Sequence, residues 1–288
     1  MTAAAIALAF ASAFCFGVAL VLTQLGLRHI SPLAGAAISI PSSALLFIGA
    51  APFVLADTPV LWLGVPIFAA VGLLFPAAVT LLTFEANRVL GPVITGALGN
   101  LAPLFAVALA FVLLGEPLRS LQVGGLVVTV AGIIILTAGR GEHPTRWRSW
   151  HLALPLAAAA IRGFIQPTIK LGLEFWPSPF AAALIGYIVS AIVLITVARL
   201  RTGRYVASAP LGSRLWFVAV GFCNGLAVLL MYAALASGRV ALVSPLVATY
   251  PLVTVVFGTL VLGKIDDGTR LAVGTMVIVA GVALLITG

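Results

Sequence analysis

Acidic side chains are scarce in this sequence. Only seven of its 288 residues are Asp or Glu, and charged residues of both signs make up 8%. Soluble domains carry roughly 25% charged and 45–50% apolar residues, whereas 62% of the residues here are hydrophobic. A chain this apolar cannot cover its surface with polar groups, so most of it must have lipid as its solvent. The composition therefore excludes a soluble globular domain.

Cysteine and histidine are also few, with two cysteines and three histidines. Cys15 and Cys223 lie in the middle of apolar runs, at a spacing that suits neither a metal site nor a disulfide framework. His29, His143 and His151 are too scattered to form a catalytic or metal-binding group at one depth. The sequence also has no phosphate-binding glycine loop. We therefore expect no enzyme, no metal and no cofactor.

Long apolar runs dominate the chain. A helix needs about 20 apolar residues to cross a bilayer, and ten runs of about that length are present: 3–27, 32–56, 60–84, 92–115, 118–139, 150–173, 178–199, 215–236, 241–263 and 269–287. Turn signals such as Ser31-Pro32 and Gly91-Pro92 separate them. The first run is too long for a cleaved signal and has no basic leader, so we expect it to be retained. The predicted fold class is an all-α integral membrane protein with ten transmembrane helices.

The second half of the sequence repeats the first. A shift of 148 residues places Pro103-Leu104 on Pro251-Leu252, and a shift of 146 places Gly17 on Gly163. With a shift of 149, three glycines spaced by seven fall on three others: Gly125, Gly132 and Gly139 on Gly274, Gly281 and Gly288. Seven residues are two helical turns, so each triplet lines one helix face, where small residues allow helices to approach closely.

This repeat divides the chain into a first five-helix repeat at 1–139, a connecting loop at 140–149 and a second five-helix repeat at 150–288. Five is an odd number, so the second half must enter the membrane from the opposite side. Such inverted repeats are typical of transporters, whose substrate sites lie near the midplane between the halves. Two similar halves also provide a route to alternating access.

The basic residues indicate the orientation. Loops on one side carry eleven of them: Arg28, Arg88, Arg140, Arg146, Arg148, Arg199, Arg201, Arg204, Arg214, Lys264 and Arg270. The other side carries only Arg119 and Arg239. Because cytoplasmic loops are enriched in Lys and Arg, we expect both termini to be periplasmic. The net charge of +8 then reflects orientation, and we expect no nucleic-acid binding.

Together these features resemble the drug/metabolite transporter superfamily, in its ten-helix EamA-type branch. The resemblance rests on the five-plus-five repeat, on Phe16-Gly17 followed by Ser31-Pro32, and on Leu114-Gly115-Glu116. It implies a multi-pass protein of the bacterial inner membrane that exports amino acids, aromatic ones among them, and related metabolites. The chain departs from the family pattern at Gly263-Lys264, where a glycine–glutamate pair is expected, and lacks the arginine that often follows Ser-Pro.

Ionisable residues inside a membrane are costly and are candidates for function. Arg162 lies about 12 residues, hence roughly 18 Å, from the start of its span, and no Asp or Glu is found in mid-span. A carboxylate of the substrate would satisfy its guanidinium through two parallel hydrogen bonds. Alternatively, helix carbonyls or Gln166 satisfy it in a wet crevice.

Arg162, Gln166 and Lys170 are spaced by four residues and therefore line one helix face. Lys170 either contacts substrate or extends to the membrane surface. Pro167 interrupts the same helix and frees a backbone carbonyl. Further substrate-binding candidates are polar residues within other spans, each with a structural alternative in helix–helix hydrogen bonds: Gln24, Asn100, Asn224, Tyr232 and Tyr250. With Pro167, the matched Pro103 and Pro251 are candidate gating or bending points.

Proton antiport commonly uses a deep carboxylate, and the sequence places none in mid-span. The sequence therefore favours a gradient-driven uniporter or exchanger, although proton coupling through Glu85 stays open. A nucleotide-sugar or drug transporter of the same superfamily is the alternative within the class, and a membrane-embedded enzyme is the alternative outside it. We expect the lipid bilayer and a small-molecule substrate as partners, with the monomer as the functional unit. Substrate identity, transport direction and coupling do not follow from the sequence.

The orientation can be tested with a reporter fused to the C-terminus. We expect a periplasmic signal, because the basic loops retain the opposite side in the cytoplasm. The same reporter inserted into the connection at 200–214 is the control and should report the cytoplasm. A cytoplasmic signal from the C-terminal fusion would overturn the charge argument.

Overall fold

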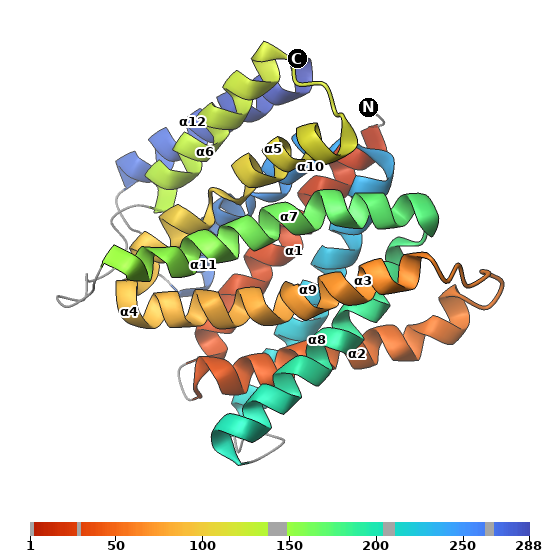
Figure 1. Cartoon of the computed structure of the whole chain (residues 1–288). Helices are drawn as coiled ribbons and strands as arrows, with labels where there is room; N and C mark the ends of the chain where they lie inside the picture. Colours follow the sequence, from red (N-terminus) through yellow and green to blue (C-terminus); the bar gives the residue numbers. More distant parts are fainter. Residues whose placement is uncertain (1–2, 28–29, 138–148, 204–210, 263–267) are drawn as a thin grey trace.

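A computed structural model describes residues 3–27, 30–137, 149–203, 211–262 and 268–288. Within these ranges the chain is entirely helical, with no strand (Figure 1). The elements of the first half are α1 (Ala3–Gly26), α2 (Pro32–Val54), α3 (Gly64–Gly72), the π-helix η1 (Leu73–Ala78), α4 (Val79–Gly99), α5 (Ala102–Leu114) and α6 (Ser120–Thr137). Those of the second half are the 3-10 helix η2 (Ser149–Leu152), α7 (Ala153–Phe175), α8 (Pro179–Thr202), α9 (Leu211–Ser237), α10 (Val240–Val247), α11 (Tyr250–Leu262) and α12 (Gly268–Thr287).

Seven helical stretches of the described chain are long and apolar enough to cross a membrane: Ala3–Thr23, Pro32–Val54, Gly64–Thr83, Trp150–Phe175, Pro179–Thr202, Leu211–Ser237 and Val240–Gly258. Three shorter apolar helices accompany them: Ala102–Leu114, Ser120–Ile135 and Val273–Thr287. Large apolar side chains such as Phe53 and Leu200 are at least 80% exposed. Lipid accommodates such side chains where water does not, so the protein is a multi-pass membrane protein.

The predicted turn at Gly91-Pro92 is wrong. α4 continues through both residues to Gly99, and the chain breaks only at Asn100 and Leu101. The turn signal fails because a proline within a membrane helix is tolerated where neighbouring helices and local adjustments satisfy the freed backbone groups. The predicted span 60–84 is not straight, because its backbone leaves the helical conformation at Phe75 (φ −136°, ψ 132°), before Pro76.

The matched prolines each begin a helix after a break. α5 begins directly after the break at Asn100 and Leu101, and Pro103 is its second residue. Pro251 is the second residue of α11, which follows a break of two residues after α10. A proline is favourable in the first helical turn because no intrahelical bond is lost there. α7, in contrast, runs through Pro167 without interruption.

The first helix of each half packs on the other half. α1 contacts α9 and α11, while α7 contacts α3, α4 and α5. A Cβ at Gly17 would lie 2.5 Å from the Val253 Cβ, and a Cβ at Gly163 would lie 2.4 Å from the Phe105 Cβ. The shifts of 146 and 148 that align the two sequences also pair these positions. Matched glycines therefore make matched contacts across the two halves.

The last helices of the two halves, α6 and α12, pack along each other (Figure 1). A Cβ at Gly125 would lie 2.7 Å from the Gly281 oxygen, and one at Gly281 would lie 2.4 Å from the Thr129 Oγ1. Gly132 and Gly288 meet the partner helix in the same way, whereas Gly139 lies outside the described residues. Packing is thus the role of these four glycines, as their spacing predicts.

Two neighbouring glycines of α6 test this packing. Gly125→Ala should lower the free energy of unfolding by about 1–3 kcal/mol, because its Cβ would meet backbone atoms that cannot move away cheaply. Gly124→Ala is the matched control, since a Cβ there meets nothing within 4 Å and alanine favours the helix. Thermal unfolding in detergent measures both. Equal melting temperatures for the two variants would contradict the close contact of α6 with α12.

Candidate functional site

A cavity of about 250 Å³ lies between the helices of the two halves. Helices from both halves line it, among them α1, α2, α4, α7, α9 and α11. Its wall is mostly apolar, with a limited set of polar side chains: Thr23, Ser39, Ser43, Thr80, Thr83, Asn100, Arg162, Gln166, Tyr187, Asn224, Ser244 and Tyr250. A concave, mainly apolar site with few polar groups is the usual form of a small-molecule site.

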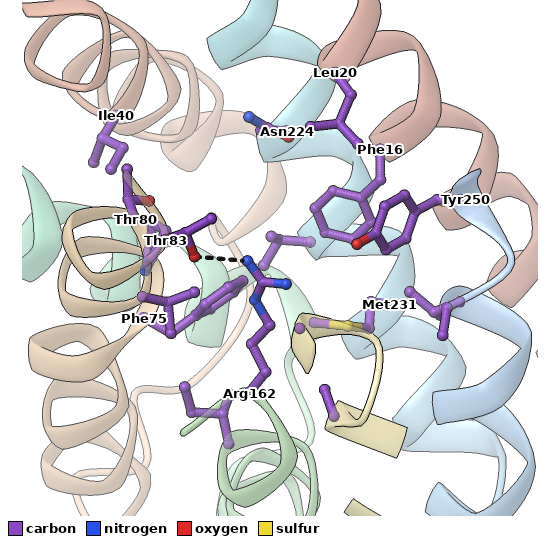
Figure 2. Close-up of a pocket in the computed structure, with 18 of the residues that line it drawn as sticks. Phe16, Leu20, Ile40, Phe75, Thr80, Thr83, Arg162, Asn224, Met231 and Tyr250 are labelled. Atoms are coloured by element: carbon purple, nitrogen blue, oxygen red, sulfur yellow. Dashed lines mark hydrogen bonds between the residues drawn. The ribbon is translucent and has the colours of Figure 1, made fainter. Parts of the chain in front are cut away.

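Arg162 extends from α7 into this cavity (Figure 2). Its Nη2 donates a hydrogen bond to the Thr83 Oγ1 at 3.3 Å, which uses one of the five N–H donors of the guanidinium. Arg162 is the one formally charged residue in the described lining, and no described carboxylate lies within ion-pair distance of it. Among the described residues, Thr83 is the hydrogen-bond partner of the Arg162 side chain.

Two polar atoms of residues in the cavity wall lack a hydrogen-bond partner. The Oε1 atom of Gln166, a residue 7% exposed, and the Oγ atom of Ser244, 1% exposed, are buried and have no hydrogen-bond partner. A buried polar atom without a partner costs about 1–3 kcal/mol, so such atoms are uncommon and require an explanation. Both residues belong to the lining of the cavity that holds Arg162, where the polar groups of a bound molecule are candidate partners.

Apolar and aromatic groups form the facing wall. The rings of Phe16 and Tyr250 are in contact, with centroids 6.3 Å apart. Figure 2 shows them on one side of the Arg162 side chain, with Met231 below them and Phe75 on the opposite side. The cavity therefore offers a cationic, polar region next to an apolar and aromatic one.

Five of the eight substrate-binding candidates come together in this cavity: Arg162, Gln166, Asn100, Asn224 and Tyr250. Tyr232 does not belong to the lining; its side chain is 2% exposed and packs in the apolar core. Lys170 does not line it either. The side chain of Gln24 lies outside the described residues. Of the three prolines, Pro103 belongs to the lining, while Pro251 and Pro167 are buried elsewhere.

Lys170 has a carboxylate partner that the sequence did not reveal. Its Nζ donates to the Glu116 Oε1 at 2.7 Å and to the Gly238 oxygen at 2.8 Å. The same carboxylate accepts from the backbone N–H groups of Val240 and Ala241, at 3.0 and 3.2 Å, and thereby caps the start of α10. We call these five residues the Glu116 cluster. Lys170 is thus engaged in holding helices together.

The Leu114-Gly115-Glu116 motif explains how Glu116 arrives there. Gly115 ends α5 in the left-handed conformation, with φ 62°, which glycine adopts without steric cost. The chain then turns and brings Glu116 under α10. A second contact joins the same segments, because Arg239 Nη2 donates to the Pro117 oxygen. The motif therefore ties the α5–α6 connection to the α9–α10 connection and to α7.

Several lining residues were not predicted from the sequence. Ser244, Thr80 and Thr83 carry small hydroxyl groups, which occur throughout membrane helices and usually bond to their own backbone. Phe16, Phe75 and Met231 are apolar residues in apolar runs. The sequence contains no signal that would separate these lining residues from residues that only pack.

The ion pair in the Glu116 cluster can be tested by stability measurements. Glu116→Ala should lower the free energy of unfolding by about 2 kcal/mol or more, since Lys170 loses its counterion and α10 its cap. Glu174→Ala, an exposed carboxylate on the same helix as Lys170, is the matched control and should change stability by less than about 0.5 kcal/mol. Adding Lys170→Ala to Glu116→Ala should recover part of the loss. If Glu116→Ala and Glu174→Ala are equally stable in denaturant titrations, the ion pair between Glu116 and Lys170 contributes nothing to stability.

The comparisons with known proteins agree with this architecture. The EamA-like transporter family matches the chain twice, over residues 3–138 and 149–287. A crystal structure with 20% sequence identity has a TM-score of 0.83 and covers 99% of this chain and 96% of its own, which shows a shared fold. No curated protein sequence matches the chain. The two family matches confirm the resemblance seen in the sequence: this chain belongs to the EamA-like transporter family.

Proposed function

We propose that this protein exports small amphipathic metabolites that carry a carboxylate, amino acids and aromatic amino acids among them, by alternating access through the cavity described above. The observation that carries the proposal is Arg162, a guanidinium inside an apolar cavity without a described carboxylate partner. A charge at such a place is costly, and a cavity that is occupied in each transport cycle would receive the missing anion from its substrate.

The chemistry of the site suits a carboxylate. A guanidinium presents paired N–H donors in a plane, which match the two oxygens of a carboxylate. Thr83 orients the Arg162 side chain through its hydrogen bond, so the remaining donors are directed before substrate arrives. The partnerless Gln166 and Ser244 lie in the same lining and add polar contacts for the same end of the molecule.

The contacts between the two halves support alternating access. We propose that the chain crosses the membrane ten times, as two inverted five-helix halves that act within one monomer. Matched glycines, Gly17 and Gly163, make matched contacts across the halves. Halves related in this way can exchange their packing on either side of a central site, which is how inverted repeats expose that site alternately.

The position of the cavity suggests the side from which substrate enters. α1 contributes residues between Phe16 and Thr23, from its second half, and α2 contributes residues between Ala36 and Ser43, from its first half. Both sets lie toward the α1–α2 connection, which belongs to the basic and therefore cytoplasmic side. The Glu116 cluster lies toward the other side, since Lys170 is about 6 Å beyond Gln166 along α7. We propose that this arrangement loads from the cytoplasm of a bacterial cell and is closed toward the periplasm.

The alternatives receive less support. A nucleotide sugar carries a diphosphate, for which more than one cation would be needed, and Lys170 is bound to Glu116. The EamA-like family is one of transporters, so a membrane-embedded enzyme has no observation in its favour.

Transport assays on Arg162 variants test the proposal. In proteoliposomes loaded with a panel of labelled amino acids and other carboxylates, Arg162→Ala should abolish flux, and Arg162→Lys should reduce it by about tenfold or more because a lysine binds a carboxylate through one point charge. Arg214→Ala, at an exposed residue of α9, is the matched control and should retain flux. Size-exclusion profiles and melting temperatures verify that each variant is folded. Wild-type flux in both Arg162 variants would remove the carboxylate role.

A further inference from the structure

The charge balance of the cavity restricts its substrate further. Its described lining holds one positive charge, that of Arg162, and no carboxylate. Four acidic residues are described outside the lining. Glu85 is half-buried on α4 and has contacts of its own. Glu116 is bound in its cluster, and Asp57 and Glu174 are exposed. A zwitterion would leave the cavity with a net charge of +1 and would bring an ammonium group that finds no counterion. A monoanion would neutralise the cavity, and burial of a charge is favourable only when it is paired.

Neutral polar groups do not replace the missing carboxylate. The partnerless atoms Gln166 Oε1 and Ser244 Oγ can accept from an ammonium, but a neutral acceptor stabilises a buried cation far less than an opposite charge does. The same two side chains can also serve an anion. A hydroxyl group both donates and accepts, and a side-chain amide presents N–H donors when it turns over. Both groups therefore add to the anion-binding capacity of Arg162.

From this balance we infer that the cavity prefers a carboxylate on an apolar body without a neighbouring ammonium, and that transport of this net anion is electrogenic. The inference rests on the proposed function and assigns the charge of its substrate. The carboxylate binds Arg162, and the apolar body packs on Phe16, Tyr250 and Met231 (Figure 2).

The inference also supplies an energy source. The cytoplasm is negative relative to the outside, so the membrane potential drives a monovalent anion outward. At 100 mV this field corresponds to an equilibrium concentration ratio of about 50. An exporter of an organic anion needs no proton-carrying carboxylate in its cavity, which agrees with the described lining.

Matched substrate pairs test this inference. Purified protein in liposomes is given 3-phenylpropanoate or phenylalanine, and 4-methylpentanoate or leucine, so that each pair differs chiefly in the ammonium group. A potassium gradient with valinomycin sets the potential. We expect at least tenfold faster uptake of each anion than of its amino acid, and accumulation of the anion that changes with the potential. Empty liposomes correct for passage of the neutral acid through lipid, and the Arg162→Gln variant is assayed in parallel.

The outcomes separate this inference from the proposed function. Equal or faster uptake of the amino acids would overturn the charge preference and leave the transporter intact. Anion uptake that does not respond to the potential would overturn the electrogenic step. No protein-dependent flux of any of the four compounds would count against both proposals. Loss of the anion preference in Arg162→Gln, with folding retained, is the result expected if the guanidinium sets it.

Discussion

The structure depends on one constraint: a charge placed in lipid must find a partner. Three charged side chains of the described chain show how such partners are found: Arg162, Lys170 and Glu116. Two of them satisfy each other, and Glu116 also caps α10. The third, Arg162, has only the Thr83 hydroxyl. A deep charge has a similar cost for Arg162 and for Lys170, so their partners distinguish their roles. Lys170, paired with Glu116, holds helices together, whereas Arg162 faces the cavity.

Small residues permit the packing that creates this cavity. Lipid gives no hydrophobic force that would draw helices together, so close van der Waals contact must do so. Gly17, Gly163 and Gly125 supply it where backbones of the two halves meet. These contacts join the halves at their first and last helices, and the space between them remains as the cavity. Packing therefore positions the α7 backbone that carries Arg162, and the Thr83 hydroxyl orients its side chain.

Much of the fold follows from the sequence because lipid requires long apolar runs and glycine spacing marks helix contacts. The matched prolines, Pro103 and Pro251, likewise mark breaks that the structure contains. The turn at Gly91-Pro92 fails because turn signals are calibrated on chains in water. The partner of Lys170 was missed since Glu116 is 54 residues away in sequence, and no local pattern encodes such a contact. Ser244 was missed because a hydroxyl carries no sign of whether it is bonded.

The two sides of the bundle differ where the repeat is imperfect. The shift of 148 places Lys264 on Glu116 and Pro92 on Val240. A lysine cannot accept from a helix N-terminus, and a proline has no N–H to donate, so the sequence of the other half does not repeat the groups that form the Glu116 cluster. In the same way, the shift of 146 places Phe16 on Arg162, which puts the cation on one face of the cavity and an aromatic ring on the other. The repeat thus supplies two similar scaffolds, and its departures give the cavity a cation on one face and an aromatic ring on the other.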